Sequence, residues 1–303
     1  MKKVNQSIQL QDESFEVSMD LFDQCSSSSK SNLVLTPLTL NELKSFFDKD
    51  AIKVINFFLK RSIFSQPELI KGQTSLPIHI PKEHIEQWVV QALGVNPKGA
   101  GSYPVDVIAN NWAADVKMLS SKVDDKGNLK NGDSGETSLA QKFSDDNFGT
   151  ENLDTLFTDK KFDLIWKFWK KILVNKYKEI YKIQKIQSIY YFFILRAGKK
   201  FHLCGLKVDL SKLKNTAVDI SLSTKNNIRI KNYINDEFGN IKIYKAKKRL
   251  ELRLKAKKWV EDKKVITFDS NFKQRFINIR KTLNNNKLDS YVDEIIKIFK
   301  QDI

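Results

Sequence analysis

The sequence predicts a mixed α/β protein, of the α+β kind, in which helices flank a central mixed β-sheet. Apolar residues recur at the spacing of amphipathic helices in three segments, 40–61, 81–93 and 153–181. Four other segments are rich in β-branched and aromatic residues, as strands are: 103–109, 112–119, 188–197 and 201–210. Alternation of the two kinds of segment indicates a sheet whose faces are covered by helices.

Length and composition indicate a packed protein. The 303 residues are 41% hydrophobic, yet no apolar run reaches the roughly 18–20 residues that a membrane span needs. The N-terminal residues lack the apolar stretch of a secretory signal, and two cysteines, Cys25 and Cys204, are too few for a disulfide framework. We therefore expect a cytoplasmic protein that does not associate with membranes.

The ends of the first two helices are indicated by their flanking residues. Thr39 is suited to cap the helix at 40–61, because Glu42 follows three residues later and completes a capping box. Pro81 lies at the start of the second helix and Gly94 at its end, which is the usual placement of these two residue types.

Turn residues pair the strands into hairpins. Asn110-Asn111 separates 103–109 from 112–119, and Ala197-Gly198 separates 188–197 from 201–210. Between the hairpins we expect a short helix at 138–143 and the long one at 153–181. Nearer the C-terminus, the sequence predicts a hairpin of 228–234 with 241–244, and period-two alternation places Leu250, Leu252 and Leu254 on one face.

Charge is distributed unevenly along the chain. Residues 1–160 carry 17 Lys and Arg against 22 Asp and Glu, whereas residues 161–303 carry 35 against 14. We expect a mainly helical region at 1–78, a core at 79–212 and a basic, β-rich region at 213–303. The basic half is suited to a polyanionic partner. The alternative is a generally lysine-rich composition, which does not explain why the first half lacks the excess.

The first hairpin brings three charged residues together. A turn at Asn110-Asn111 places Asp106 opposite Asp115, and Lys117 lies two residues further along the same face. The opposite, core-facing side is expected to carry four apolar residues, Val105, Val107, Ala114 and Val116. Opposed aspartates repel each other unless a cation lies between them, so the pattern indicates a metal site with an adjacent ammonium group.

Carboxylate oxygens favour Mg²⁺, or Mn²⁺ as a substitute, over zinc. Such a site suits phosphodiester hydrolysis, because a bound metal positions water and neutralises developing charge. The alternative is an internal salt bridge in which Asp106 or Asp115 pairs with Lys117. Other acid-x-Lys pairs occur in this chain, as at Asp124-Lys126, but they lie in polar contexts.

Pro104-Val105-Asp106 followed by Asp115-Val116-Lys117 resembles the motif of the PD-(D/E)xK, restriction-endonuclease-like nuclease superfamily. The resemblance covers about 80–145 and includes the preceding helix and the Gly/Ser loop at 99–102. It implies a restriction-endonuclease-like core for 79–212. By resemblance Asp106 and Asp115 are metal ligands, Lys117 is catalytic, and Glu86, or Glu83 as second choice, supplies a further active-site carboxylate. Gln141, on the helix expected after the hairpin, is a possible active-site residue.

The resemblance, together with the additional regions, favours a sequence-specific type II restriction endonuclease of a bacterium. It implies Mg²⁺-dependent cleavage of double-stranded DNA by a homodimer, and a methyltransferase in the same cell that protects the site. One alternative is a DNA repair or Holliday-junction-resolving nuclease of the same fold. The other is a non-catalytic DNA-binding protein.

A basic block at 242–258 is the expected DNA-binding surface. Its side chains would contact phosphates, which gives affinity that falls with salt. The predicted contacts are Lys245, Lys247, Lys248, Arg249, Arg253, Lys255 and Lys257. The alternative is a solvated strand face.

Overall fold

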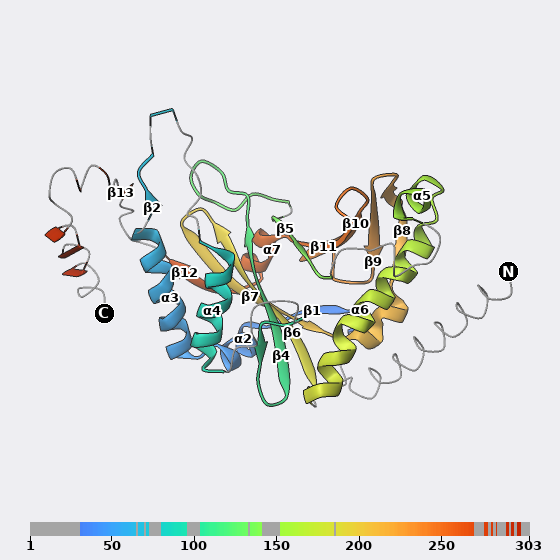
Figure 1. Cartoon of the computed structure of the whole chain (residues 1–303), viewed down its shortest axis with the longest axis horizontal. Helices are drawn as coiled ribbons and strands as arrows, with labels where there is room; N and C mark the ends of the chain where they lie inside the picture. The colour runs from blue at the N-terminus through green and yellow to red at the C-terminus, as the bar shows by residue number, and fades with distance from the viewer. Residues whose placement is uncertain are drawn as a thin grey trace.

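The computed structural model in Figure 1 describes most of the chain between residues 31 and 269. Within that span it leaves out 65, 70, 73–79, 96–103, 133, 141–151 and 185. Beyond it the described residues are 276–277, 280, 283, 289–290, 292–293 and 296–297. None of the helices described in these ranges has the length and apolar character needed to cross a membrane.

A mixed sheet forms the centre of the molecule, as predicted. Its strands run in the order β1-β7-β6-β4-β3, and β12 also pairs with β7. Among the described strands of this sheet, β4 and β6 are the pair that runs parallel; the connection between them contains the long helix α6, as a parallel crossover requires. The strand bounds are β1 Leu35–Pro37, β3 Val107–Ile108, β4 Trp112–Ser120, β6 Ser188–Ala197, β7 Lys200–Val208 and β12 Ile266–Asp269.

Helices cover both faces of this sheet. In Figure 1, α3 (Lys49–Phe64) and α4 (Lys82–Leu93) lie on one side of β4 and β6, and α6 (Phe162–Gln184) lies on the other. Ile85 and Val89 of α4 belong to the same buried cluster as Val116 of β4. Trp169 and Tyr177 of α6 belong to the cluster on the opposite face. The predicted arrangement of a mixed sheet between helices is therefore confirmed.

A second, antiparallel sheet packs beside the first, in the order β5-β11-β10-β9-β8. It contains the predicted C-terminal hairpin, and Leu250, Leu252 and Leu254 all point into the core that the sheet shares with α6. Its strands are β5 Glu136–Ser138, β8 Ala217–Thr224, β9 Asn227–Lys231, β10 Gly239–Tyr244 and β11 Arg249–Leu254. The remaining elements are α5 Leu153–Thr158, α7 Ala256–Glu261, the 3₁₀ helix η2 Leu210–Asn215, and a parallel pair of β2 Gln66–Pro67 with β13 Phe276–Ile277.

Strands from all three predicted regions contribute to the central sheet. β1 comes from the region 1–78 and β12 from the region 213–303, and both pair with β7. The division of the chain at 78 and 212 stays a prediction about domains.

Two predicted long helices are each divided in the structure. The segment 40–61 forms α2 (Leu40–Phe46) and α3, because Asp48 Oδ1 accepts hydrogen bonds from the amides of Asp50 and Ala51 and so begins a new helix. The predicted capping box of Thr39 and Glu42 is present at the start of α2. The segment 153–181 forms α5 and α6, which are separated at Lys160 by a left-handed backbone with φ of 56°.

The prediction of a helix at 138–143 is wrong at the first residue of that segment. Residues 136–138 form strand β5, which pairs with β11 in the register Glu251–Ser138 and Leu252–Thr137. The pairing partner lies more than a hundred residues away, and local sequence carries no information about it. Residues 141–143 lie outside the described part.

Candidate active site

The β3–β4 hairpin forms with the predicted register. Val107 pairs with Ala114 and Ile108 with Ala113, so the chain turns at Asn110-Asn111. The Asp106 amide donates to the Ala114 carbonyl at 3.0 Å, which continues the pairing past the end of the two-residue strand β3. The residue numbers of each pair sum to 221, and this register sets Asp106 opposite Asp115.

Three of the four residues predicted on the core-facing side lie there. Val107, Ala114 and Val116 pack in the cluster beneath α3 and α4, whereas Val105 packs in the cluster on the α6 face. The prediction for Val105 was wrong because β3 begins only at Val107, and the alternation of a strand does not hold before it.

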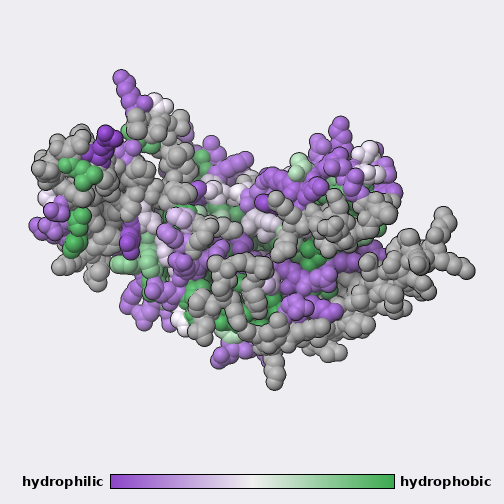
Figure 2. Space-filling model, viewed as in Figure 1, coloured by the Kyte–Doolittle hydropathy of each residue, from purple (hydrophilic) through white to green (hydrophobic). Residues whose placement is uncertain are grey.

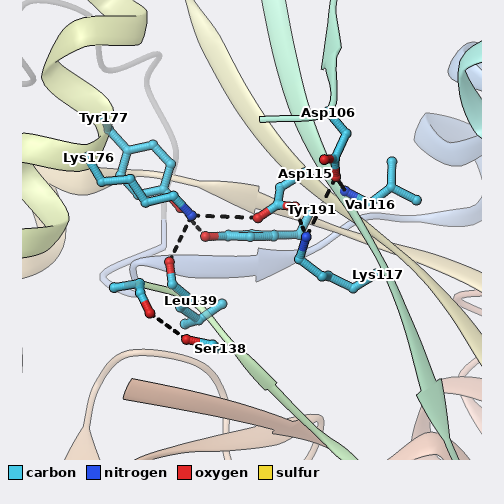
Figure 3. Close-up of polar contacts among 10 residues, drawn as sticks. Asp106, Asp115, Val116, Lys117, Ser138, Leu139, Lys176, Tyr177 and Tyr191 are labelled. Atoms are coloured by element: carbon cyan, nitrogen blue, oxygen red, sulfur yellow. Dashed lines mark hydrogen bonds and ion pairs between the residues drawn. The ribbon is translucent and has the colours of Figure 1, made fainter. Parts of the chain in front are cut away.

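Asp106, Asp115 and Lys117 meet on the α6 face of the hairpin (Figure 3). Lys117 Nζ forms an ion pair with Asp115 and lies 3.6 Å from Asp106 Oδ2. The same oxygen of Asp106 accepts a hydrogen bond from the Val116 amide at 2.6 Å. Asp115 is only 5% exposed, so the carboxylate is held inside the protein.

A second ammonium group, which sequence reasoning missed, reaches Asp115 from the other side. Lys176 of α6 places Nζ 3.6 Å from Asp115 Oδ2 and donates a hydrogen bond of 2.8 Å to the Leu139 carbonyl (Figure 3). Its sequence position carried a signal. Lys176 lies three residues after Leu173 and four before Ile180, both fully buried, so it falls within the apolar stripe of the helix.

Two tyrosines enclose the Lys176 ammonium. It lies 5.0 Å from the ring centre of Tyr177 and 5.7 Å from that of Tyr191, and the two tyrosine hydroxyls are hydrogen-bonded to each other. Tyr191 is the residue of β6 that pairs with Asp115 in the parallel register. Aromatic faces attract a cation, so these rings offset part of the cost of burying the lysine.

Burial and mutual repulsion shift the ionisation of this cluster. Burial raises the pKa of Asp106 to about 7, and the nearby charge of Asp115 adds to that increase. Burial also acts to raise the pKa of Asp115, but the ammonium groups of Lys176 and Lys117 outweigh it and hold that pKa below 3.8. For Lys117, burial lowers the pKa, and the two aspartates outweigh it and raise the pKa above 10.5.

Lys176 shows the opposite balance. Burial lowers the pKa of its ammonium below 10.5, and although Asp115 acts to raise it, the net shift is downward. The cluster thus contains one carboxyl with a raised pKa and one ammonium group with a lowered pKa, both at a single buried location.

The other predicted site residues lie in or beyond α4. Glu86 is half-buried on α4, and its charge contributes to the raised pKa of Lys117. Glu83 is part of α4, but its side chain lies outside the described set, as does the whole of Gln141. The helix on which Gln141 was predicted begins as strand β5 instead.

The donor set suits a hard divalent cation. Asp106 and Asp115 offer carboxylate oxygens; burial, and then the charge of Asp115, raise the pKa of Asp106, and a bound cation would favour its ionised form. Within the described residues no group of three or more His, Cys, Asp or Glu side chains is placed to hold a metal. Mg²⁺ is commonly bound by one or two carboxylates, with water and substrate phosphate completing its shell. The pair therefore fits Mg²⁺ or Mn²⁺ bound together with a phosphate.

The predicted DNA-binding residues lie on and around the β10–β11 hairpin, and many of them form ion pairs. Lys247 and Arg253 both contact Glu136, and Lys247 lies 3.5 Å from Glu251. Lys245 lies 3.7 Å from Asp154, and Lys257 lies 3.7 Å from Glu261.

Three of the predicted DNA-binding residues lack such ion pairs among the described residues. Lys248, Arg249 and Lys255 make no ion pair with any residue in the described part of the chain. These cations are the ones that a polyanion could contact without first breaking an ion pair.

Comparison of the chain with protein-family models, with curated proteins and with solved structures gave no match. The interpretation of the site therefore rests on its geometry.

Proposed function

We propose that the protein is a Mg²⁺-dependent nuclease whose central sheet and flanking helices form a restriction-endonuclease-like core. The observation that carries the proposal is the meeting of Asp106, Asp115 and Lys117 on one face of the β3–β4 hairpin. Glu86 supplies a fourth charged group near them. This arrangement agrees with the motif resemblance of the same residues.

A structural salt bridge does not account for the cluster. Such a bridge needs one carboxylate and one ammonium, and even that pair seldom stabilises a protein relative to well-packed apolar residues. Here two carboxyls converge with two ammonium groups, Lys117 and Lys176. Burial raises the pKa of Asp106 to about 7, so its ionised form is disfavoured even with Lys117 beside it. Perturbed carboxyls that converge in this way are typical of functional sites.

Bound Mg²⁺ would supply Lewis-acid stabilisation of the charge that develops on a phosphate during hydrolysis. Asp106 and Asp115 would hold it, and their orientation is fixed by the Val116 amide and by Lys176 respectively. Lys117 Nζ lies beside both aspartates. There it would orient the attacking water and offset developing negative charge.

Within the nuclease class we propose a type II restriction endonuclease that cuts double-stranded DNA as a homodimer, with a protective methyltransferase in the same cell. Support comes from the second sheet, whose β10–β11 hairpin carries cations outside the site itself. A repair or junction-resolving nuclease, and a DNA-binding protein without activity, are the competing outcomes of the test.

The test is plasmid digestion with Mg²⁺, with Mn²⁺ and with EDTA. We expect discrete fragments with either metal and none with EDTA, and loss of cleavage in Asp115→Asn and Lys117→Met. Asp124 and Lys126 provide a matched control, because they have the same acid-x-Lys spacing on an exposed loop; Lys126→Met should cut normally.

Other results would contradict parts of the proposal. Cleavage of branched substrates alone would support a junction-resolving enzyme. Intact plasmid together with DNA binding would support a binding protein, and unchanged cleavage by Lys117→Met would show that the site lies elsewhere. Mn²⁺ binding, followed by the paramagnetic resonance of the free ion, should be lost in Asp106→Asn whether or not the protein cuts DNA.

A further inference from the structure

A pocket of about 530 Å³ lies at the outer face of the second sheet, and Asp106, Asp115 and Lys117 are not among the residues that line it. It is lined by Glu136, Ser138, Ala246, Lys247, Arg249 and Glu251. These residues come from strand β5, from strand β11 and from the turn that joins β10 to β11. Figure 2 shows hydrophilic residues gathered over the part of the molecule where Figure 1 places this sheet.

The pocket contains a buried carboxylate with an unused acceptor. Glu251 is 3% exposed, and it points away from the core into which its neighbours Leu250 and Leu252 are packed. Its Oε2 accepts no hydrogen bond, and its ion pair with Lys247 spans 3.5 Å. A buried carboxylate oxygen without a hydrogen bond is costly, and a donor group that enters the pocket would supply the bond that Lys247 does not make.

Arg249 supplies the complementary group. It is exposed and lies two residues before Glu251 on the same face of β11. The guanidinium has no ion pair or hydrogen bond to any residue that the structure describes. The other arginine of this strand face, Arg253, is bound to Glu136 and stacks over Tyr244, and so is already engaged.

We propose that this pocket reads a G·C base pair in the major groove of double-stranded DNA. Glu251 would accept a hydrogen bond from the N4 amino group of cytosine, and Arg249 would donate to O6 and N7 of guanine. Residues two apart on a strand are about 6.6 Å apart, which is comparable to the width of one base-pair edge. The β10–β11 hairpin lies between β9 and β5 in the second sheet, and its turn at 245–248 lies beyond the residues that pair with either neighbour. In the proposed complex this end of the hairpin enters the major groove, which admits a two-stranded β-ribbon.

Hydrogen bonds and an ion pair connect the proposed recognition pocket to the proposed catalytic cluster. Ser138 lines the pocket, and the carbonyl of the next residue, Leu139, accepts the hydrogen bond of Lys176, which in turn lies 3.6 Å from Asp115 (Figure 3). The amide of Gly135 donates to the Ser120 carbonyl at the end of β4. The segment 134–140 therefore contacts both the pocket and the strand that carries the catalytic residues.

The inference rests on the proposed function only in taking duplex DNA as the ligand, so binding tests it separately from cleavage. The folded full-length protein is incubated in EDTA with a library of random-sequence duplexes, and the bound fraction is sequenced. We expect enrichment of a G·C pair at a fixed position.

Two variants test the residues individually. Arg249→Ala should reduce discrimination at that position by between about 5-fold and 150-fold. Glu251→Gln should shift the preference toward A·T, because glutamine pairs with the N6 and N7 edge of adenine. The control is Lys248→Gly, at a turn residue with φ of 47° that glycine adopts readily. It should weaken binding to all sequences alike and reduce the salt slope by about 0.9.

Several results would overturn the inference. It fails if Arg249→Ala retains the wild-type preference, if Glu251→Gln changes neither the base nor its enrichment, or if the wild-type protein cuts plasmid at fixed sites without enriching G·C. If Glu251→Gln unfolds, as circular dichroism would reveal, the exposed Arg249→Ala variant decides alone. Enrichment of G·C without any cleavage would support the inference and contradict the nuclease proposal.

Discussion

Replacing Lys176 by methionine tests whether this buried ammonium holds Asp115 in place. The substitution keeps the length and apolar stem of the side chain and removes only the charge and its hydrogen bonds. Nζ lies 3.6 Å from Asp115 Oδ2 and 2.8 Å from the Leu139 carbonyl, so both partners lose a contact. Asp115 keeps Lys117 as its remaining partner, whereas no other donor among the described residues reaches the Leu139 carbonyl.

The expected loss of stability is a balance of opposing contributions. At 3.6 Å and an effective dielectric constant near 20, the attraction is worth about 4–5 kcal/mol. Desolvation of the ammonium offsets several kcal/mol of it. The carbonyl left without a donor costs about 1–3 kcal/mol. We expect a net decrease of about 2–3 kcal/mol in the free energy of unfolding, and a Tm lower by roughly 4–12 °C.

Chemical and thermal unfolding, monitored by circular dichroism in EDTA, measures this decrease. The control is Lys167→Met, at an exposed position of the same helix, which should change the free energy of unfolding by less than about 0.5 kcal/mol. In an Asp115→Asn background, Lys176→Met should cost less by about 0.5–3 kcal/mol, since the charge partner is gone. Equal costs in both backgrounds, or a Lys176→Met protein as stable as wild type, would refute the ion pair as the role of this lysine.

Two further predictions concern the packing of the two sheets. Burial raises the pKa of the Cys204 thiol well above its ordinary value, so the thiolate is scarce at pH 8. In a Cys25→Ser background, native protein should therefore not react with a thiol-specific chromogenic disulfide, and unfolded protein should react fully; rapid native reaction would contradict the buried placement. Gly239→Ala should destabilise the protein by about 1–3 kcal/mol, because the added Cβ would meet a backbone carbonyl of β11 at 2.6 Å. Gly205→Ala, which meets a flexible leucine methyl at 2.7 Å, should cost less; unfolding titrations that reverse this order would refute the argument.

The sequence was sufficient for those parts of the fold that local chemistry determines. The turn at Asn110-Asn111 and the alternation on either side of it set the hairpin register, and hence the pairing of Val107 with Ala114. The long strands β6 and β7 were predictable for the same reason, since an apolar run, a glycine with φ of 62° at Gly198 and a second apolar run form a hairpin.

The errors occurred where a single side chain or a distant strand decides the structure. Asp48 could have been part of a continuous helix, but its carboxylate caps a new one. Lys160 adopts a left-handed conformation that the residue type does not favour. The segment 136–138 has no strong preference of its own, and it becomes a strand because β11 offers a pairing edge.

In the candidate site, too, the residues on one hairpin could be predicted from the sequence, and the residue from a distant helix could not. Asp106, Asp115 and Lys117 could be placed together because one hairpin carries all three residues. Lys176 approaches from a helix some sixty residues later in the chain, and its contact with Asp115 depends on how α6 packs on the sheet. A lysine within an apolar helical stripe indicates burial, but it does not identify the partner.

The basic block shows why a count of charges overstates the cations that are available to a ligand. Glu136 of β5 forms ion pairs with Lys247 and Arg253. The sequence of the basic block does not indicate these ion pairs, because Glu136 lies more than a hundred residues earlier in the chain. These ion pairs hold β5 against β11 and leave Arg249 as the strand's unengaged guanidinium. The carbonyl of Leu139, three residues after Glu136, accepts the hydrogen bond of Lys176, so the ion pairs of Glu136 also hold the segment between the proposed recognition pocket and Asp115. Under the proposed function, Glu136 would therefore position the recognition pocket, although its negative charge would oppose the binding of DNA.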